Sequence, residues 1–270
     1  MSAAAPVGVF DSGVGGLSVL AELRRELPAE DFLYYADSAH APYGERSPAE
    51  VEQLTRSAIQ WLREQGCKAV VIACNTACAF SLASVRAWVG DGLPVIGLVP
   101  ALKPAVAATR SGVVGVFATP VTLEGSLLRD VVAQFAQPAG IRVLPLWHNG
   151  MVPAVEAGQQ DAPATDTALR DLLTPAADQG MDTLVLGCTH YPFLVPAIRR
   201  SFGDRFALFD SGRGVARRTR QVLTERGLLN PVGGQVRYLT TGNPAQVQPV
   251  VRQLMQEDVA VTGIRIEVPL

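Results

Sequence analysis

The 270-residue chain has little excess charge of either sign and no long apolar run. Its 23 Lys and Arg residues against 25 Asp and Glu residues give a formal net charge of −2. This balance gives no electrostatic reason to expect binding to nucleic acid or to an acidic membrane surface. Nowhere do about 18 apolar residues follow one another, so no membrane-spanning helix is predicted. The start, MSAAAPVGVFDSG, lacks the basic segment and apolar stretch of a secretory signal.

Cysteine and lysine are both scarce. Four cysteines are too few for a disulfide scaffold at this length, so we expect reduced thiols and a cytoplasmic location. A pyridoxal phosphate cofactor needs a lysine for its Schiff base, and only Lys68 and Lys103 are present. Lys68 lies at the start of a predicted strand, the wrong end for a site, and Lys103 lies at a helix start between two prolines. The sequence therefore does not favour this cofactor.

The chain contains enough apolar residues for a large core. It is 48% hydrophobic and 18% charged, with 25 Gly and 19 Pro, which excludes a disordered, collagen-like or coiled-coil chain. A chain of this length forms one large domain or two of about 100 to 150 residues.

Short apolar runs alternate with amphipathic stretches along the chain, which predicts an α/β fold with mostly parallel sheets. The sequence Ser47-Pro48-Ala49-Glu50 has the form of a capping box that opens a helix. The predicted strands cover 7–10, 32–36, 69–73, 95–98, 113–117, 142–146, 183–186 and 206–209. The predicted helices cover 17–27, 48–65, 77–89, 103–109, 121–136, 163–179, 193–201 and 213–227.

Two pairs of segments resemble each other at a separation close to half the chain. Val7–Phe10 matches Val114–Phe117, and Val70–Thr76 resembles Leu184–His190. We interpret this as an internal duplication that ends one strand of each half in a cysteine. The alternative is that strands of Val, Ile and Leu look alike without common origin.

The duplication predicts two similar lobes related by a pseudo-two-fold axis, with the active-site cleft between them. The first lobe is expected to comprise residues 1–98 and 210–270, and the second residues 99–209. Phe10-Asp11-Ser12-Gly13 recurs as Phe209-Asp210-Ser211-Gly212, where we expect the chain to return to the first lobe.

Polar clusters follow several predicted strands, at the carboxyl ends where open parallel sheets bind ligands. The four clusters are Asp11-Ser12-Gly13, Asp37-Ser38, Cys74-Asn75-Thr76 and Cys188-Thr189-His190. If the two lobes face each other, one cysteine lies on each side of the cleft. Side chains of Asn75, Thr76 and Thr189, with nearby backbone N–H groups, can hold a carboxylate.

The two cysteines in these clusters differ in context from the other two. A free thiol has a pKa near 8.5, so about 3% is thiolate at pH 7, and a helix N-terminus or a cationic His raises that share. Cys74 precedes the helix expected from Ala77, and Cys188 has His190 two residues on. Cys67 and Cys78 read as small buried hydrophobes.

Two thiols on opposite faces of one ligand suit a specific reaction. One thiolate removes a proton from a carbon atom and the other thiol returns a proton to the opposite face, which inverts a stereocentre without a cofactor. A closed cleft and fixed dipoles would be needed, because a carbon acid beside a carboxylate is very weak.

Metal and nucleotide sites are not predicted. Structural zinc normally takes four ligands in pairs, whereas Cys74 and Cys78 are accompanied only by Cys188 and His190. The glycine-rich turn over 13–18 lacks the final Gly or Ala of a dinucleotide fingerprint, and Asp11 would repel a phosphate.

The chain strongly resembles the glutamate racemases of the aspartate/glutamate racemase superfamily from about residue 7 to 212. After residue 212 it matches only in general character. The matching stretches are GVFDSGVGGLSVL (8–20), ADSAHAPYGERS (36–47), VVIACNTACA (70–79), PVIGLVPALKPA (94–105), LVLGCTHYPFL (184–194) and FDSG (209–212).

The resemblance implies cofactor-independent interconversion of L- and D-glutamate, which supplies D-glutamate for peptidoglycan, and a homodimer is expected because the family forms dimers. It implies that Cys74 acts on the D-enantiomer, assisted by Asp11, and that Cys188 acts on the L-enantiomer, assisted by His190. A Glu near the cleft is also typical of the family, and Glu156 is the candidate. The glutamate-binding residues implied are Asp11, Ser12, Tyr43, Gly44, Asn75, Thr76, Thr189 and His190.

Several alternatives stay open at this stage. The segment over 144–150 departs from the Cys-Pro form of many members, so Glu156 could instead be a solvated helix residue. Asp37 is as suited to capping a turn as to touching substrate, while His40 and His148 read as loop histidines. The Val99-Pro100-Ala101 sequence resembles a branch that includes enzymes activated by a peptidoglycan precursor.

Other functions also stay open. A racemase for aspartate or another acidic compound, a related decarboxylase, and a non-catalytic amino-acid-binding module are the competing hypotheses. Two opposed cysteines favour racemisation, because one-way decarboxylation needs only one proton donor.

Overall fold

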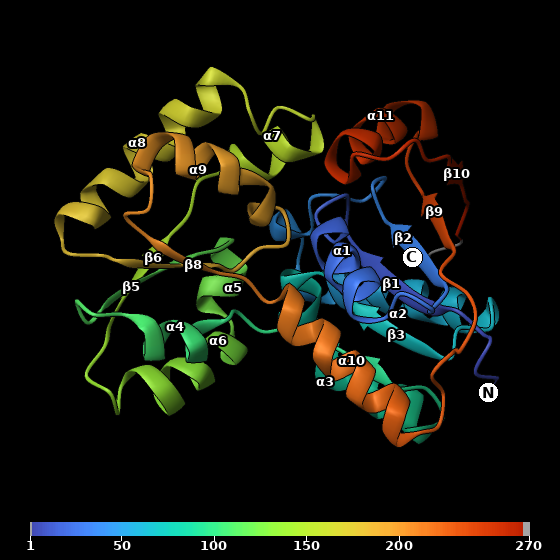
Figure 1. Cartoon of the computed structure of the whole chain (residues 1–270). Coiled ribbons are helices and arrows are strands. Elements are labelled where there is room, and N and C mark those ends of the chain that lie inside the picture. Colours follow the sequence, from blue (N-terminus) through green and yellow to red (C-terminus); the bar gives the residue numbers. More distant parts are fainter. Residues whose placement is uncertain (1, 267–270) are drawn as a thin grey trace. The chain divides into compact units, whose positions relative to one another are not determined.

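The computed structural model describes residues 2–266 and divides into two compact units (Figure 1). Within that range the first unit takes the chain up to Leu98 and from Gly212 onward, and the second unit is Val99–Ser211. The second unit therefore runs to Ser211 rather than to residue 209. Residues 1 and 267–270 of the expected first lobe lie outside the described residues. The Ser211 hydroxyl donates to the Val99 carbonyl at 2.7 Å, so the two ends of the second unit lie together.

Parallel strands form the sheet of the first unit in the order β10-β9-β2-β1-β3-β4. The strands are β1 (Val7–Asp11), β2 (Phe32–Ala36), β3 (Ala69–Ile72), β4 (Val95–Ile96), β9 (Val236–Thr240) and β10 (Val261–Gly263). In the register, Val9 of β1 lies opposite Tyr34 on one side and Val71 on the other. All residues of β1, β2 and β3 are buried, as expected of central strands covered on both faces.

The helices of the first unit form two packed groups: α1 contacts α10 and α11, and α2 contacts α3. They are α1 (Leu17–Glu26), α2 (Pro48–Glu64), α3 (Asn75–Val89), α10 (Gly212–Glu225) and α11 (Pro244–Met255), with short 3-10 turns η1 (Tyr43–Glu45) and η2 (Gly90–Gly92). The capping box at the start of α2 is confirmed. The Ser47 hydroxyl accepts from the Glu50 N–H, and the Glu50 carboxylate accepts from the Ser47 N–H.

The second unit has a smaller parallel sheet in the order β6-β5-β7-β8. Its strands are β5 (Val113–Phe117), β6 (Arg142–Leu146), β7 (Thr183–Leu186) and β8 (Ala207–Phe209). Helices α8 and α9 lie on one side of this sheet, and α4, α5 and α6 lie on the other (Figure 1). The helices are α4 (Leu102–Ala108), α5 (Pro120–Glu124), α6 (Ser126–Val131), the π-helix η3 (Val132–Ala136), α7 (Met151–Glu156), α8 (Pro163–Asp178), the 3-10 turn η4 (Tyr191–Leu194) and α9 (Val195–Phe202).

The two sheets share one topology. Taking each unit's first four strands in chain order, both sheets read second, first, third, fourth: β2-β1-β3-β4 and β6-β5-β7-β8. Every strand pairing among the described residues is parallel. The predicted α/β fold with parallel sheets is confirmed, and the matching order supports the internal duplication.

Some expected elements differ from the structure. The single helix predicted over 121–136 is broken at Gly125, whose extended backbone (φ −66°, ψ 148°) ends α5 and starts α6. Strands β9 and β10 and helix α11 were not predicted. Within residues 2–266 no helix has both the length and the apolar character needed to cross a membrane.

Candidate active-site residues in the two units

The turn after β1 is built around a buried carboxylate. Asp11 ends β1 without solvent exposure, and its Oδ1 accepts from the Gly13 N–H at 2.7 Å and from the Ser12 hydroxyl at 3.3 Å. The Tyr34 hydroxyl donates to the Gly13 carbonyl at 2.7 Å, which fixes the turn. At Gly16 an added Cβ would lie 2.6 Å from the Asp11 Cβ, so only glycine lets α1 start this close to the carboxylate.

Cys74 lies two residues beyond the end of β3 and is the N-cap of α3. Its sulfur accepts from the Ala77 N–H at 3.5 Å and lies 3.5 Å from the Ser12 hydroxyl oxygen. The helix was expected from Ala77 but begins at Asn75, because the Cys74 sulfur takes the capping role that an oxygen usually has. The carboxyl ends of β1 and β3 thus bring Asp11, Ser12 and Cys74 together.

The surroundings of Cys74 favour the neutral thiol. Burial raises the pKa of Cys74 well above its ordinary value, and the negative charge of Asp11 raises it further. The hydrogen bonds from Ala77 and Ser12 lower the pKa, but they do not outweigh burial. Cys74 is therefore protonated at neutral pH in the unliganded protein, and it is a strong base once its proton is removed.

An unpaired donor lies next to this thiol in the chain. The Asn75 side-chain nitrogen is buried and has no hydrogen-bond partner within residues 2–266. Burying a donor unpaired costs about 1 to 3 kcal/mol, so a ligand carboxylate that accepts from it would recover that cost. Thr76, the next residue, is also buried at the start of α3.

Tyr43 of η1 belongs to the same region of the first unit. Its ring packs against Phe10, with centroids 6.2 Å apart, and its hydroxyl donates to Asp37 at 2.6 Å. Burial raises the pKa of Tyr43 well above its ordinary value, followed by the charges of Asp37 and, less strongly, of Cys74. The turn η1 also contacts α3, the helix that Cys74 caps. Gly44, the next residue, is half-buried.

In the second unit, Cys188 is linked to a carboxylate through a histidine. The Cys188 sulfur lies 3.6 Å from His190 Nδ1, and His190 Nε2 lies 2.6 Å from Glu156 Oε1 at the end of α7. Glu156 is thus not the solvated helix residue of the alternative interpretation. Thr189, between Cys188 and His190, is buried.

The surroundings of His190 favour its protonated form. Burial alone would lower the pKa of His190, but the hydrogen bonds with Cys188 and Glu156 raise it well above its ordinary value. The neighbouring Tyr191 ring stacks on Phe117, with centroids 3.9 Å apart, and holds the turn after β7 against the sheet. The result is a thiol, an imidazolium and a carboxylate in sequence.

The remaining cysteines match their predicted role as buried apolar residues. Burial raises the pKa of Cys67 to about 12 and that of Cys78 to about 12. The Cys78 thiol donates to the Ile72 carbonyl at 3.4 Å and packs beneath Cys74 in α3.

Lys68, His148 and the candidate metal ligands are further candidates from the sequence. Lys68 is fully buried beside Glu30, with Nζ 2.5 Å from Oε2, just before the start of β3. His148 Nδ1 accepts from the Gly150 N–H at 3.0 Å in the turn before α7. Within residues 2–266, no three His, Cys, Asp or Glu residues cluster as metal ligands would, and the expectation of metal-free chemistry stays a prediction.

Asp37 is the residue that the sequence interpretation underrated. It neither merely caps a turn nor lies on the surface; it is 1% exposed and bonded to several side chains, including that of Tyr43. The sequence did place Asp37 directly after β2, and β2 pairs with β1, so Asp37 could have been expected next to the Asp11 turn.

Comparison with known proteins gives a consistent result. A glutamate racemase of Deinococcus radiodurans is 58% identical over 253 residues, covering 93% of this chain and 87% of that protein. The crystal structure of an Escherichia coli glutamate racemase with L-glutamate and the activator UDP-MurNAc-Ala has a TM-score of 0.84 at 31% identity, covering 97% and 99% of the two chains. A Francisella tularensis glutamate racemase with D-glutamate has a TM-score of 0.82 at 28% identity, covering 97% and 98%. The sequence profile of the Asp/Glu/Hydantoin racemase family matches residues 7–219, and the chain belongs to that family.

Proposed function

We propose that this protein interconverts L- and D-glutamate without a cofactor, through Cys74 and Cys188. The observation that carries the proposal is the equivalence of the two cysteines. Each follows the third strand of its own unit, and each has its own ionisable neighbour, Asp11 for Cys74 and His190 for Cys188. The relatives named glutamate racemase, and the neighbouring structures that hold L- or D-glutamate, support glutamate as the substrate.

In the proposed mechanism the two thiols act on opposite faces of the α-carbon. With D-glutamate, Cys74 loses its proton to Asp11, and the thiolate then takes the α-proton. Cys188 donates its proton to the other face of the carbanion, which gives L-glutamate and leaves a Cys188 thiolate beside cationic His190. The reverse reaction uses the same groups with their roles exchanged, as microscopic reversibility requires.

The polar residues of each unit have binding roles in this proposal. Asn75 supplies the buried amide donor to a substrate carboxylate, with Ser12, Thr76 and Thr189 as further hydrogen-bonding groups. Tyr43 and Gly44 complete the binding residues on the Cys74 side. Glu156 keeps His190 protonated and oriented, so that the imidazolium stabilises the Cys188 thiolate.

The direct test is incubation of the purified protein with L-glutamate in heavy water, with no added cofactor. We expect the α-proton signal to disappear from the NMR spectrum while optical activity decays to zero. A binding module would produce neither change, and a decarboxylase would release carbon dioxide. Parallel incubations with L-aspartate and after treatment with a metal chelator address substrate choice and metal dependence; we expect turnover of glutamate to persist after chelation.

The physiological setting follows from the same proposal. D-glutamate formed by this reaction would serve peptidoglycan synthesis, and thiol chemistry suits the reducing cytoplasm. By the family resemblance we propose a homodimer, and light scattering during size-exclusion chromatography should give twice the chain mass of 28.6 kDa.

A further inference from the structure

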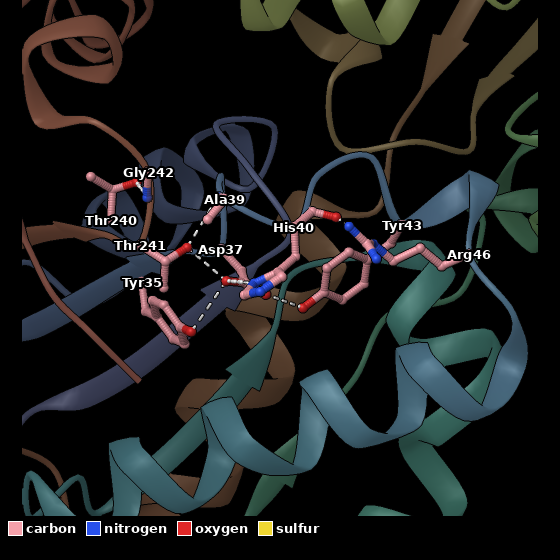
Figure 2. Close-up of polar contacts among 9 residues, drawn as sticks. All are labelled: Tyr35, Asp37, Ala39, His40, Tyr43, Arg46, Thr240, Thr241 and Gly242. Atoms are coloured by element: carbon pink, nitrogen blue, oxygen red, sulfur yellow. Dashed lines mark hydrogen bonds and ion pairs between the residues drawn. The ribbon is translucent and has the colours of Figure 1, made fainter. Parts of the chain in front are cut away.

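Asp37 is the centre of a buried hydrogen-bond network in the first unit. Figure 2 shows the side chains of Thr241, His40, Tyr43 and Tyr35 around its carboxylate. The Thr241 hydroxyl donates to Oδ1 at 2.7 Å, His40 Nδ1 lies 2.9 Å from Oδ1, and the Tyr43 hydroxyl donates to Oδ2 at 2.6 Å. Tyr35 adds a longer contact of 3.5 Å. The Asp37 carboxylate therefore joins Tyr43 of η1 to Thr241, which lies 204 positions after Asp37 in the chain.

Thr241 makes the connection from the C-terminal part of the chain. It directly follows β9, and its backbone N–H donates to the Ala36 carbonyl at 3.1 Å, continuing the pairing with β2. Its hydroxyl accepts from the Ala39 N–H at 3.1 Å while donating to Asp37, so a single oxygen is bonded on both sides (Figure 2). Both bonds need a hydroxyl and neither can be made by a valine.

The backbone after Thr241 is fitted to the same loop. An added Cβ at Gly242 would lie 2.9 Å from the Ser38 Cβ, so the turn over 240–242 approaches the loop too closely for any larger residue. At the far end of the loop, Arg46 Nε donates to the His40 carbonyl at 2.6 Å (Figure 2). Thr241 thus attaches the loop over 37–46 to the turn after β9, and the bond from Arg46 to His40 closes the loop on itself around Tyr43.

We propose that Asp37 and Thr241 are positioning residues for the reaction: Thr241 fixes the Asp37 carboxylate, and Asp37 holds the Tyr43 phenol at the end of β1, where its ring packs on Phe10 next to Asp11. Neither residue touches the reacting atoms. The inference rests on the proposed function for the roles of Tyr43 and Cys74. It also gives the segment after residue 227, where the sequence predicted no element, a part in the site, because β9 carries Thr241 to the loop.

The test compares Thr241→Val with Thr241→Ser. Valine keeps the size of the side chain but removes both hydroxyl bonds, so we expect kcat/KM for glutamate to fall about tenfold, mainly through KM. Serine retains the hydroxyl and should restore kcat/KM to within about twofold of the parent protein. In a Tyr43→Phe background, Thr241→Val should have little further effect, because the phenol that it positions is already absent.

Hydrogen exchange provides a readout that does not depend on turnover. In Thr241→Val the amides of residues 39–46 should exchange at least about tenfold faster, while amides of β1 and β3 keep the parent rate. Thr219→Val is the matched control, because it removes a buried threonine hydroxyl that bonds only within α10, to the Val215 carbonyl. It should change neither loop exchange nor kinetics.

The outcomes are separable. Unchanged loop exchange in Thr241→Val, or equal loss of activity in the serine variant, would overturn the positioning role. Additive effects of Thr241→Val and Tyr43→Phe would overturn the route through Tyr43. A parent protein that does not racemise glutamate would overturn the proposed function instead, while the exchange result would still decide whether Thr241 orders the loop.

Discussion

Cys74 and Cys188 occupy the same topological position but have opposite electrostatic surroundings. Each follows the third strand of its unit, and both are buried. Burial and the charge of the nearby Asp11 carboxylate raise the pKa of Cys74, whereas Cys188 contacts His190, whose own pKa is raised by hydrogen bonds with Cys188 and Glu156. Duplicated backbone geometry therefore does not imply duplicated acid–base chemistry. Each unit surrounds its cysteine with a different ionisable group.

The difference has a consequence for the two reaction directions. In the proposed mechanism, deprotonation of D-glutamate by Cys74 first needs the removal of a proton from a thiol whose pKa is raised. The kcat/KM for D-glutamate, which reports groups of the free protein, should therefore keep rising with pH above neutrality.

Replacing either thiol should have the largest effect. Cys74→Ser and Cys188→Ser should each reduce racemisation by about 10³-fold or more in both directions, because each direction uses one sulfur as base and the other as acid. Circular dichroism with each enantiomer measures the rates, and thermal unfolding shows that the fold is kept. Cys67→Ala is the control, since that thiol lies outside the site. Full activity in either serine variant would remove its thiol from the mechanism.

Asp11→Asn should make the two thiols more alike. Loss of the carboxylate charge lowers the pKa of Cys74, although burial, the larger cause of the raised pKa, remains. At pH 8 iodoacetamide should modify Cys74 faster than in the parent protein, as followed by mass spectrometry, with the rate at Cys188 as the internal reference. Racemisation should fall about 10²-fold, because asparagine cannot accept the thiol proton. Slower modification of Cys74 would contradict the assigned charge effect.

Glu156→Gln should weaken the contact that raises the pKa of His190 next to Cys188. The pKa of His190 should fall toward its ordinary value, as measured by NMR titration, and racemisation should fall about tenfold, less than for loss of a general acid or base. The raised pKa stabilises the fold fully below the unfolded value of about 6.5, and this stabilisation is lost as pH rises through the folded pKa. The parent protein's advantage in urea unfolding should therefore be largest near pH 6 and shrink at higher pH; an advantage that grew with pH would contradict this sign.

Ser47→Ala should have the smallest effect of these substitutions on racemisation, and it should not alter the difference between the two cysteines. It removes the capping box of α2 and should lower the free energy of unfolding by about 1 kcal/mol. The ratio of the two reaction rates should stay unchanged, because α2 supplies none of the proposed catalytic groups. A changed ratio would show that α2 influences one thiol selectively.

Local sequence patterns were sufficient for strands β1 to β8 and for both cysteine turns. Buried strands such as β1 and β3 read as continuous apolar runs, and the polar residues directly after them mark the sheet edge where ligands bind. The sequence was less informative for β9. Strand β9 begins with half-buried Val236 and exposed Arg237, so its apolar pattern is weak.

Local sequence patterns could not predict contacts between residues that are far apart in the chain. Thr241 is 204 residues from Asp37, and nothing in the short stretch around either residue signals the other. The contact between Glu156 and His190 spans 34 residues and depends on the placement of α7 after a segment that departs from the family pattern. The residue types were visible in advance, but their partners are set by the packing of whole elements.

The hydrogen bond between Ser211 and Val99 closes the second unit at its own two ends. An insert whose entry and exit points touch can be removed from its host with only a short bridge left behind, and the fragment itself starts and stops at one place. The same adjacency suits circular permutation, in which new termini are opened elsewhere in the inserted unit. The unit that contains Cys188 can therefore be expressed apart from the unit that contains Cys74, with the chain cut at the boundary between them.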